Sequence, residues 1–339
     1  MSVAYTHETP PQPGGTLEIQ PGLRWVRMPL PFPPDHINLW LLDDGEAGTA
    51  IVDTGLSRDD TKAHWLSAIG DDTVSRVICT HFHPDHMGLA AWLCERFGVE
   101  LWTTLGEYYT ARAVHAQGSP ADIANKVAFY TANGIGPDAI GPFASPDNIY
   151  RRGVPELPAH YRRIHARMDL RVGNEDWQPI IGRGHCPEHA CLWSKARGVL
   201  IGGDILLPRI TPNIGVWPAE PMANPLHDYL ACLDGFAHLP DDTLVLPAHG
   251  FPYRGLHGRI AAIRAHHEER LDVLREAMAG RADGLCAVDC FKLLFRREIG
   301  PHNVGLATGE ALAHLHLLES RGQARRVRDG AGVWRFVPA

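Results

Sequence analysis

The 339-residue sequence contains seven cysteines, and no two of them form a Cys-x-x-Cys pair. An odd number of cysteines without such a pair argues against a disulfide framework and against a thiolate zinc site. We therefore expect free thiols, as in a reducing cytoplasm. The sequence also lacks a basic segment followed by an apolar run near its start, which argues against a secretory signal. No uninterrupted apolar stretch is long enough to span a bilayer, so we expect a cytoplasmic protein without a membrane partner.

An excess of positive charge is also absent. The formal net charge is −7, which argues against a dedicated binder of nucleic acid or of anionic membranes. The charge is uneven, because residues 255–339 carry 13 Lys and Arg against 10 Asp and Glu. With 45% hydrophobic and 21% charged residues, the chain can bury one large core and a second, smaller one. We expect two domains after a flexible start at residues 1–16.

Histidine is plentiful, and three of the 20 histidines lie in one short segment with an aspartate. The segment contains His81, His83, Asp85 and His86, and it follows the apolar, β-branched stretch Val74–Cys79, which predicts a buried strand. Side chains at positions i and i+2 of an extended segment point to the same side, so His81 and His83 can bind one ion together. Asp85 and His86 are then directed toward a second ion. Imidazole and carboxylate ligands suit zinc, manganese or iron.

Three more apolar strands end in a candidate ligand. His185 follows the glycine-rich end of the predicted strand Trp177–Ile181, Asp204 ends the strand that begins at Val199, and His249 ends the strand that begins at Leu244. Ligands at converging strand ends of a layered fold meet at one edge of the sheet. A carboxylate in the position of Asp204 can bridge two cations. His189 is interpreted as a buried structural histidine, and Cys186 as a packing residue.

Strands are also predicted near the start, at Leu17–Ile19, Leu23–Met28, Ile37–Leu42 and Thr49–Val52. Asp53 follows the last of them and either orients a metal-ligating imidazole or forms a simple turn. Helices are predicted at 58–69 and 87–97, after which strands and helices alternate.

Residues 105–160 interrupt this alternation with two predicted helices, Gly106–Gln117 and Ala121–Asn133, which we interpret as an inserted lid. Aromatic or apolar side chains from the lid and from two Pro-rich segments, 29–34 and 208–218, are candidates for substrate contact, although aromatic residues so spaced also pack an insertion against its domain. The candidates are Phe32, Tyr108, Tyr109, Ile210 and Trp217.

Taken together, these motifs resemble the metallo-β-lactamase superfamily over residues 17–255. The resemblance implies an α/β fold, a four-layer αβ/βα sandwich, with two Zn²⁺ ions per chain, or Fe or Mn in their place. It assigns His81, His83 and His185 to the first ion and Asp85, His86 and His249 to the second, with Asp204 as the bridge. True β-lactamases with a similar ligand set lack this aspartate, so the resemblance favours the glyoxalase-II-like and nuclease-like branches.

The C-terminal residues 256–339 are predicted to form three helices, Leu256–Met278, Val288–Arg297 and Gly309–Arg321, followed by a β-hairpin. This pattern is similar to the winged-helix appendage of β-lactamase-like hydrolases. In one such branch the appendage accompanies single-stranded ribonuclease activity. Arginines of this region either form a nucleic-acid footprint or belong to a solvated hairpin that packs against the sandwich or against the second subunit of a homodimer. They are Arg321, Arg325, Arg326, Arg328 and Arg335.

We expect hydrolysis by a metal-bridging hydroxide that Asp85 orients, and whose proton Asp85 carries. The favoured substrate is a thioester, ester or lactone of a small acyl compound, with β-lactam hydrolysis at most promiscuous. The alternative is a single-stranded RNA nuclease or phosphodiesterase that uses the same metal centre. A third hypothesis is a metal-bound scaffold whose C-terminal region recruits a partner.

Overall fold

The computed structural model describes residues 3–339, and the first part of the predicted flexible start, residues 1 and 2, lies outside the described residues. Two compact units make up the chain. The first comprises residues 1–116, 148–212 and 233–260, and the second comprises residues 117–147, 213–232 and 261–339. The predicted lid at 105–160 is therefore divided between the units, because only its middle part belongs to the second.

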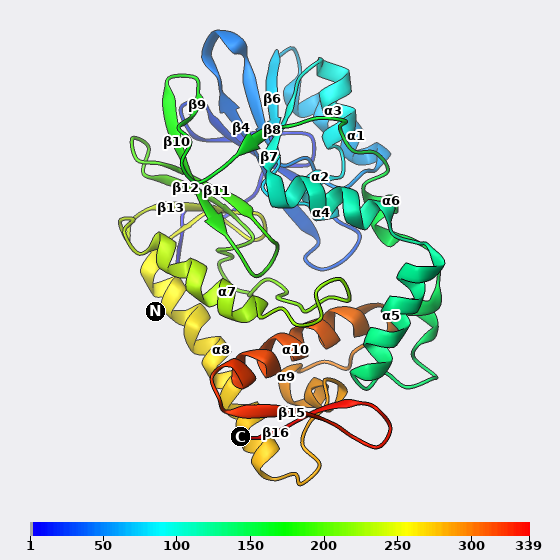
Figure 1. The fold of residues 1–339 in the computed structure, drawn as a ribbon. Helices are drawn as coiled ribbons and strands as arrows, with labels where there is room; N and C mark the ends of the chain where they lie inside the picture. The colour runs from blue at the N-terminus through cyan, green and yellow to red at the C-terminus, as the bar shows by residue number, and fades with distance from the viewer. Residues whose placement is uncertain (1–2) are drawn as a thin grey trace. The chain divides into compact units, whose positions relative to one another are not determined.

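The first seven-stranded sheet contains an antiparallel and a parallel half. The strands β2 to β5 form an antiparallel meander, and β5 to β8 are parallel, with helices in the connections between them (Figure 1). The four strands predicted near the start are confirmed, whereas the short edge strand β8 has no clear signal in the sequence. In order, the strands are β2 (Thr16–Gln20), β3 (Leu23–Pro29), β4 (His36–Asp43), β5 (Thr49–Val52), β6 (Val74–Ile78), β7 (Leu101–Thr104) and β8 (Arg162–Ile164).

The second seven-stranded sheet is antiparallel except for one parallel pair, β12 with β13. One of its edge strands, β1, lies within the predicted flexible start and pairs with β14. The spatial order is β1 (Ala4–Tyr5), β14 (Tyr253–Arg254), β13 (Leu244–Pro247), β12 (Val199–Gly203), β11 (His189–Ser194), β10 (Glu175–Gly182) and β9 (Leu170–Val172).

The two sheets enclose one apolar core, to which Trp25 and Trp40 contribute from the first sheet and Leu192 and Ile201 from the second. A second core lies on the outer face of the first sheet, under the helices α1 (Asp59–Ile69), α3 (Ala90–Phe97) and α4 (Leu105–Ala116). The alternation of buried residues toward two different cores explains why the strands of the first sheet are apolar on both faces. The predicted α/β sandwich is therefore confirmed.

The helix predicted over 87–97 is instead two helices, α2 (Pro84–Met87) and α3. The break falls at Gly88, where a Cβ atom would lie only 2.4–2.7 Å from the carbonyl oxygens of Pro84, Gly55 and Gly153. This close approach of three backbone segments explains the glycine, and it ends the histidine-bearing loop in a short helix of its own.

The second unit contains α5 (Pro120–Ala132), α7 (Pro225–Cys232), α9 (Phe291–Leu294) and α10 (Val304–Ser320), with the hairpin of β15 (Ala324–Arg328) and β16 (Trp334–Pro338). The long helix α8 (Leu256–Ala279) begins in the first unit and continues into the second. The hairpin is placed as predicted. The second C-terminal helix is shorter than the predicted range 288–297, since only a 3₁₀ turn (Val288–Cys290) and the four-residue α9 form there. In residues 3–339, no helix combines the length and the apolar character needed to cross a bilayer.

Gly48, between β4 and β5, provides a test of the packing of the first sheet. Its φ is 113°, and an added Cβ would lie 2.2 Å from the carbonyl oxygen of Thr73. We expect Gly48→Ala to lower the free energy of unfolding by about 3 kcal/mol or more, because backbone atoms on both sides must move. Gly98 is the matched control, since its φ is also positive but nothing lies within 4 Å of its Cβ position. Gly98→Ala should cost only about 1 kcal/mol in chemical denaturation. Equal losses for the two variants would contradict this account.

Candidate metal centre

Seven histidines and aspartates converge at the ends of four strands of the first unit. The segment after β6 supplies four of them, the loop after β10 supplies His185, and β12 and β13 are followed by Asp204 and His249. The structure therefore brings together every residue that the sequence predicted as a ligand. They form two groups, and within each group the candidate ligand atoms lie within 4.8 Å of one another.

The first group contains three imidazoles and one carboxylate. His81 Nε2 lies 2.8 Å from His83 Nδ1 and 3.3 Å from His185 Nε2. Asp204 Oδ2 lies 3.4 Å from His185 Nε2 and 4.0 Å from His81 Nε2. A tetrahedral ion with ligands at ~2.1 Å separates its ligand atoms by ~3.4 Å, so these distances suit one shared cation.

The second group contains Asp85, His86 and His249, and it meets the other oxygen of Asp204. Asp85 Oδ2 lies 3.7 Å from His86 Nε2 and 3.5 Å from His249 Nε2. Asp204 Oδ1 lies 3.6 Å from His86 Nε2 and 3.7 Å from His249 Nε2. Each carboxylate oxygen of Asp204 therefore faces a different group.

Two atoms around the second group are placed to bind a cation. Both His86 Nε2 and Asp204 Oδ1 are buried, and neither has a hydrogen-bond partner among the described residues. A buried polar atom without a partner is costly, and a cation between the two atoms would satisfy both. The donor set of nitrogen and carboxylate oxygen suits zinc, manganese or iron, so the residues fit a pair of divalent ions.

Burial sets the protonation of the imidazoles. Burial, together with the neighbouring histidines, holds the pKa values of His81 and His83 well below their usual range, so both rings are neutral and available as ligands. Burial acts in the same direction on His86, but Asp53, Asp85 and Asp204 outweigh it and raise the pKa of His86 to about 10, so an ion that binds Nε2 would displace a proton from this ring. Burial opposes the ionisation of Asp204, yet His249 and His86 hold its pKa well below the usual range. The centre is thus built around an ionised carboxylate.

Asp53 orients His86 by contacting Nδ1, the ring nitrogen that is not a candidate ligand atom. Its Oδ2 lies 2.8 Å from His86 Nδ1, and its carboxylate also accepts hydrogen bonds from the backbone N–H and the hydroxyl of Thr80. A carboxylate on Nδ1 directs the lone pair of Nε2 toward an ion. Asp53 has a φ of 61°, a conformation rare for residues other than glycine. The geometry agrees with the orienting alternative rather than with a simple turn.

The loop that carries His249 is fixed by β4. His249 Nδ1 donates to the carbonyl oxygen of His36 at 2.7 Å, and His36 Nε2 accepts from the N–H of Gly250 at 2.8 Å. Asn38 donates to the carbonyl oxygens of Pro247 and Gly250. The sequence analysis did not single out His36 or Asn38, and both lie in or beside a predicted strand without any local motif to mark them.

His189 is buried, as interpreted from the sequence, and supports Asp204 instead of joining the ligands. Its Nε2 accepts the backbone N–H of Asp204 at 3.2 Å, and burial lowers its pKa to about 3. Gly203 allows this contact, because a Cβ at this position would lie 2.4 Å from the His189 ring.

The predicted substrate-contacting residues differ in their surroundings. Phe32, Tyr109 and Ile210 are exposed, whereas Tyr108 is only 4% exposed. The Tyr108 hydroxyl donates to the carbonyl oxygens of Pro158 and Ala159, and its ring stacks on Tyr161. Tyr108 therefore packs within the fold and is not open to a substrate in this structure. Trp217 is partly exposed and belongs to the second unit.

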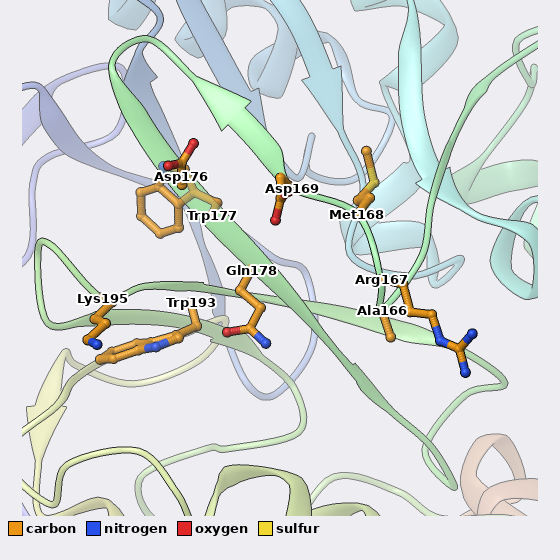
Figure 2. A pocket seen from close by; sticks show the side chains of 9 residues that line it. All are labelled: Ala166, Arg167, Met168, Asp169, Asp176, Trp177, Gln178, Trp193 and Lys195. Atoms are coloured by element: carbon orange, nitrogen blue, oxygen red, sulfur yellow. The ribbon is translucent and has the colours of Figure 1, made fainter.

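A depression of about 430 Å³ lies on the second sheet and is distinct from the ligand cluster (Figure 2). Its lining combines acidic, basic and aromatic side chains from β10, β11 and the loop before β9, and it includes none of the seven candidate ligands. The depression is lined by Ala166, Arg167, Met168, Asp169, Asp176, Trp177, Gln178, Trp193 and Lys195.

Three of the five candidate arginines of the C-terminal region are held in ion pairs within the second unit. Arg321 binds Glu268 through two hydrogen bonds, Arg326 binds Glu319, and Arg335 binds Asp329. Arg328 lies over the ring of Trp334. Paired guanidinium groups have less positive charge to offer a phosphate backbone, so this arrangement favours the solvated-hairpin alternative.

Comparison with known proteins identifies the family. The family model of the metallo-β-lactamase superfamily matches residues 32–249, and that of the metallo-β-lactamase-like C-terminal domain matches residues 271–339. The chain belongs to the metallo-β-lactamase superfamily. The C-terminal match shows that residues 271–339 are a recurrent domain of these proteins and not an isolated tail.

Relatives of this superfamily member match almost its whole length. A β-lactamase domain protein from Burkholderia ambifaria has a crystal structure with a TM-score of 0.88, 41% sequence identity and 99% coverage of both chains. The crystal structure of a metallo-β-lactamase family protein from Thermus thermophilus gives a TM-score of 0.77 at 27% identity, covering 95% of this chain and 100% of the other. A Bacillus subtilis protein named "Probable metallo-hydrolase YqjP" is 25% identical over 322 residues, 91% of this chain and 96% of the relative. Together with the His/Asp cluster, these findings identify the chain as a metal-dependent hydrolase of this superfamily.

Asp204→Asn tests the shared carboxylate. The amide leaves one oxygen for one group and turns an NH₂ toward the other, so we expect Zn²⁺ affinity to fall by roughly 100-fold or more at one or both positions. The measurement is the bound-metal stoichiometry after titration against a chelator, in which the unchanged protein should take up two equivalents. Asp176→Asn, an exposed acid of the depression in Figure 2, is the matched control and should keep both ions. Undiminished uptake by Asp204→Asn would show that the carboxylate does not bridge.

Proposed function

We propose that this chain is a dinuclear-metal hydrolase that cleaves a thioester, ester or lactone of a small acyl compound. The observation that carries the proposal is the placement of Asp204, whose two oxygens face two separate sets of ligands. In the proposed assignment, His81, His83 and His185 hold one ion, Asp85, His86 and His249 hold the other, and both share Asp204. Zinc is the favoured ion, and iron and manganese suit the same ligands.

Bound divalent ions would polarise the scissile carbonyl and lower the pKa of water toward ~7. The chain's own contribution is to position the reacting groups. Asp85 directs its Oδ2 toward His86 and His249, and its side chain is 15% exposed, more than that of Asp204. We assign Asp85 the role of orienting the attacking water and of passing its proton to solvent.

An acyl substrate is favoured by apolar segments beside the second group. Pro208 lies against the backbone of Gly250, where a Cβ would be 2.7 Å from its ring. Arg259 fixes residues 207–210 by donating to the carbonyl oxygens of Leu207 and Ile210, and the Ile210 side chain is exposed. Phe32 is exposed on the turn that leads to His36, and the carbonyl oxygen of His36 contacts His249. We propose that Phe32 and Ile210 contact the acyl group, with Tyr109 as a further candidate.

A substrate panel tests this proposal. The protein loaded with Zn²⁺ or Mn²⁺ should hydrolyse a member of a panel of acyl thioesters, esters and lactones, and it should leave single-stranded RNA intact in a parallel assay. We expect Asp85→Asn to lower kcat by about 100-fold or more when the rate is normalised to bound metal, because a positioned proton acceptor is lost.

Asp176→Asn is the control for Asp85→Asn, since it makes the same change at an exposed acid of the depression in Figure 2, whose lining includes none of the candidate ligands, and it should leave the rate unchanged. Absence of turnover across the whole acyl panel by fully loaded protein would refute the acyl assignment. Salt-sensitive RNA binding that is lost on Arg325→Ala, together with RNA cleavage, would favour the nuclease alternative instead.

A further inference from the structure

Glu107 is a buried acid that the proposed chemistry does not use. It lies in the first turn of α4, two positions beyond the helix start, and its residue exposure is 0%. A buried carboxylate needs hydrogen-bond donors, and this one finds them in two separate loops of the metal centre.

The two carboxylate oxygens of Glu107 accept from backbone N–H groups of different loops. Oε2 accepts from Phe82, which stands between His81 and His83, at 2.9 Å. Oε1 accepts from Glu188, three residues after His185, at 2.6 Å. One loop follows a strand of the first sheet and the other follows a strand of the second. Glu107 therefore connects the two sheets through the two loops that carry the first group of ligands.

Reciprocal contacts hold Glu107 itself in place. Glu188 Oε2 accepts the N–H of Gly106 at the start of α4 at 2.8 Å, and the Thr104 hydroxyl donates to the carbonyl oxygen of Glu188 at 2.8 Å. The Cys186 thiol also hydrogen-bonds to Glu107. A carboxylate at the beginning of a helix is favourably placed for the helix dipole, so the helix start and the loop stabilise each other.

The ligands of the second group depend on different supports. Asp53 holds His86, and His36 holds His249 and Gly250. Glu107 has no hydrogen bond with the loop of His249 among those described in residues 3–339. The two groups share Asp204 and the Thr80 hydroxyl, which lies 3.2 Å from Nδ1 of both His81 and His86. Glu107 differs from these shared contacts, because of the loops that carry ligands it binds the two that carry His81, His83 and His185.

We propose that Glu107 is a positioning residue for the first metal position, which sets the spacing between the His81/His83 loop and the His185 loop. This inference rests on the proposed dinuclear centre and adds to it a separate determinant of affinity for one of the two ions. Glu107 touches neither substrate nor ion.

Glu107→Gln tests the inference, because an amide has one acceptor oxygen for two backbone donors and its NH₂ would oppose one of them. In a two-step Zn²⁺ titration against a chelator, we expect the affinity of one step to fall by about 10–100-fold. The other step should stay within about threefold. In a Co²⁺ titration, the absorption spectrum of the affected position should also change, a signature that a general loss of stability does not produce.

Two further variants serve as controls. One tests whether a general loss of stability weakens metal binding, and the other identifies which binding step belongs to the first metal position. Glu310→Gln makes the same change at a partly buried carboxylate of the second unit, where Arg270 binds it, and should leave both metal affinities unchanged even if it lowers the melting temperature. His83→Ala identifies the step that belongs to the first position, which should be the step that Glu107→Gln weakens. If Glu107→Gln does not fold, Glu107→Asp replaces it, because a shorter carboxylate cannot reach both N–H groups and should weaken the same step.

The outcomes separate this inference from the proposed centre. Two-ion binding by the unchanged protein with no loss in Glu107→Gln, or with equal loss at both steps, overturns the role of Glu107 and leaves the centre intact. Failure of the unchanged protein to bind any divalent metal overturns the centre and the role of Glu107 together. Selective weakening of the step identified by His83→Ala supports both.

Discussion

The buried carboxylate of Asp204 sets the main constraint on this structure. It lies between two groups of imidazoles, its Oδ1 has no hydrogen-bond partner in the described residues, and its charge requires compensation that water cannot supply there. The glycine before it, the close approach of His189 and the convergence of four strand ends all serve to place this one group. Two cations, one at each oxygen, would complete a site that is otherwise unfavourable to bury.

Three side chains outside the ligand set keep the ligand loops in register. Asp53 holds the end of β6, Glu107 joins the loops of both sheets, and His36 fixes the loop after β13. Each of the three side chains accepts hydrogen bonds from backbone N–H groups. Asp53 also contacts the ring of a ligand, His86. The precision of the centre therefore depends on backbone hydrogen bonds at the strand ends, where the regular ladder of the sheet has stopped.

Strand ends were the part of this molecule that the sequence predicted well. An apolar run followed by His or Asp is a local pattern, and layered topology requires such ends to meet, so His185, Asp204 and His249 could be grouped with His81 without coordinates. Long-range contacts could not be predicted in the same way. The break at Gly88 depends on three carbonyl groups from distant segments, and the roles of His36 and Asn38 depend on a neighbouring sheet. Glu107 was not singled out by the sequence either, because only the fold shows which donors it meets.

The distribution of the ligands over both sheets has a consequence for folding. Residues 81–86 extend from the first sheet, whereas His185, Asp204 and His249 extend from the second. A complete set of ligands cannot form during synthesis until residue 249 has emerged and the two sheets have closed on each other. Ions that bind only the closed sandwich would stabilise it by mass action, and their release would be coupled to separation of the sheets. Metal availability would then govern the lifetime of the folded chain as well as its chemistry.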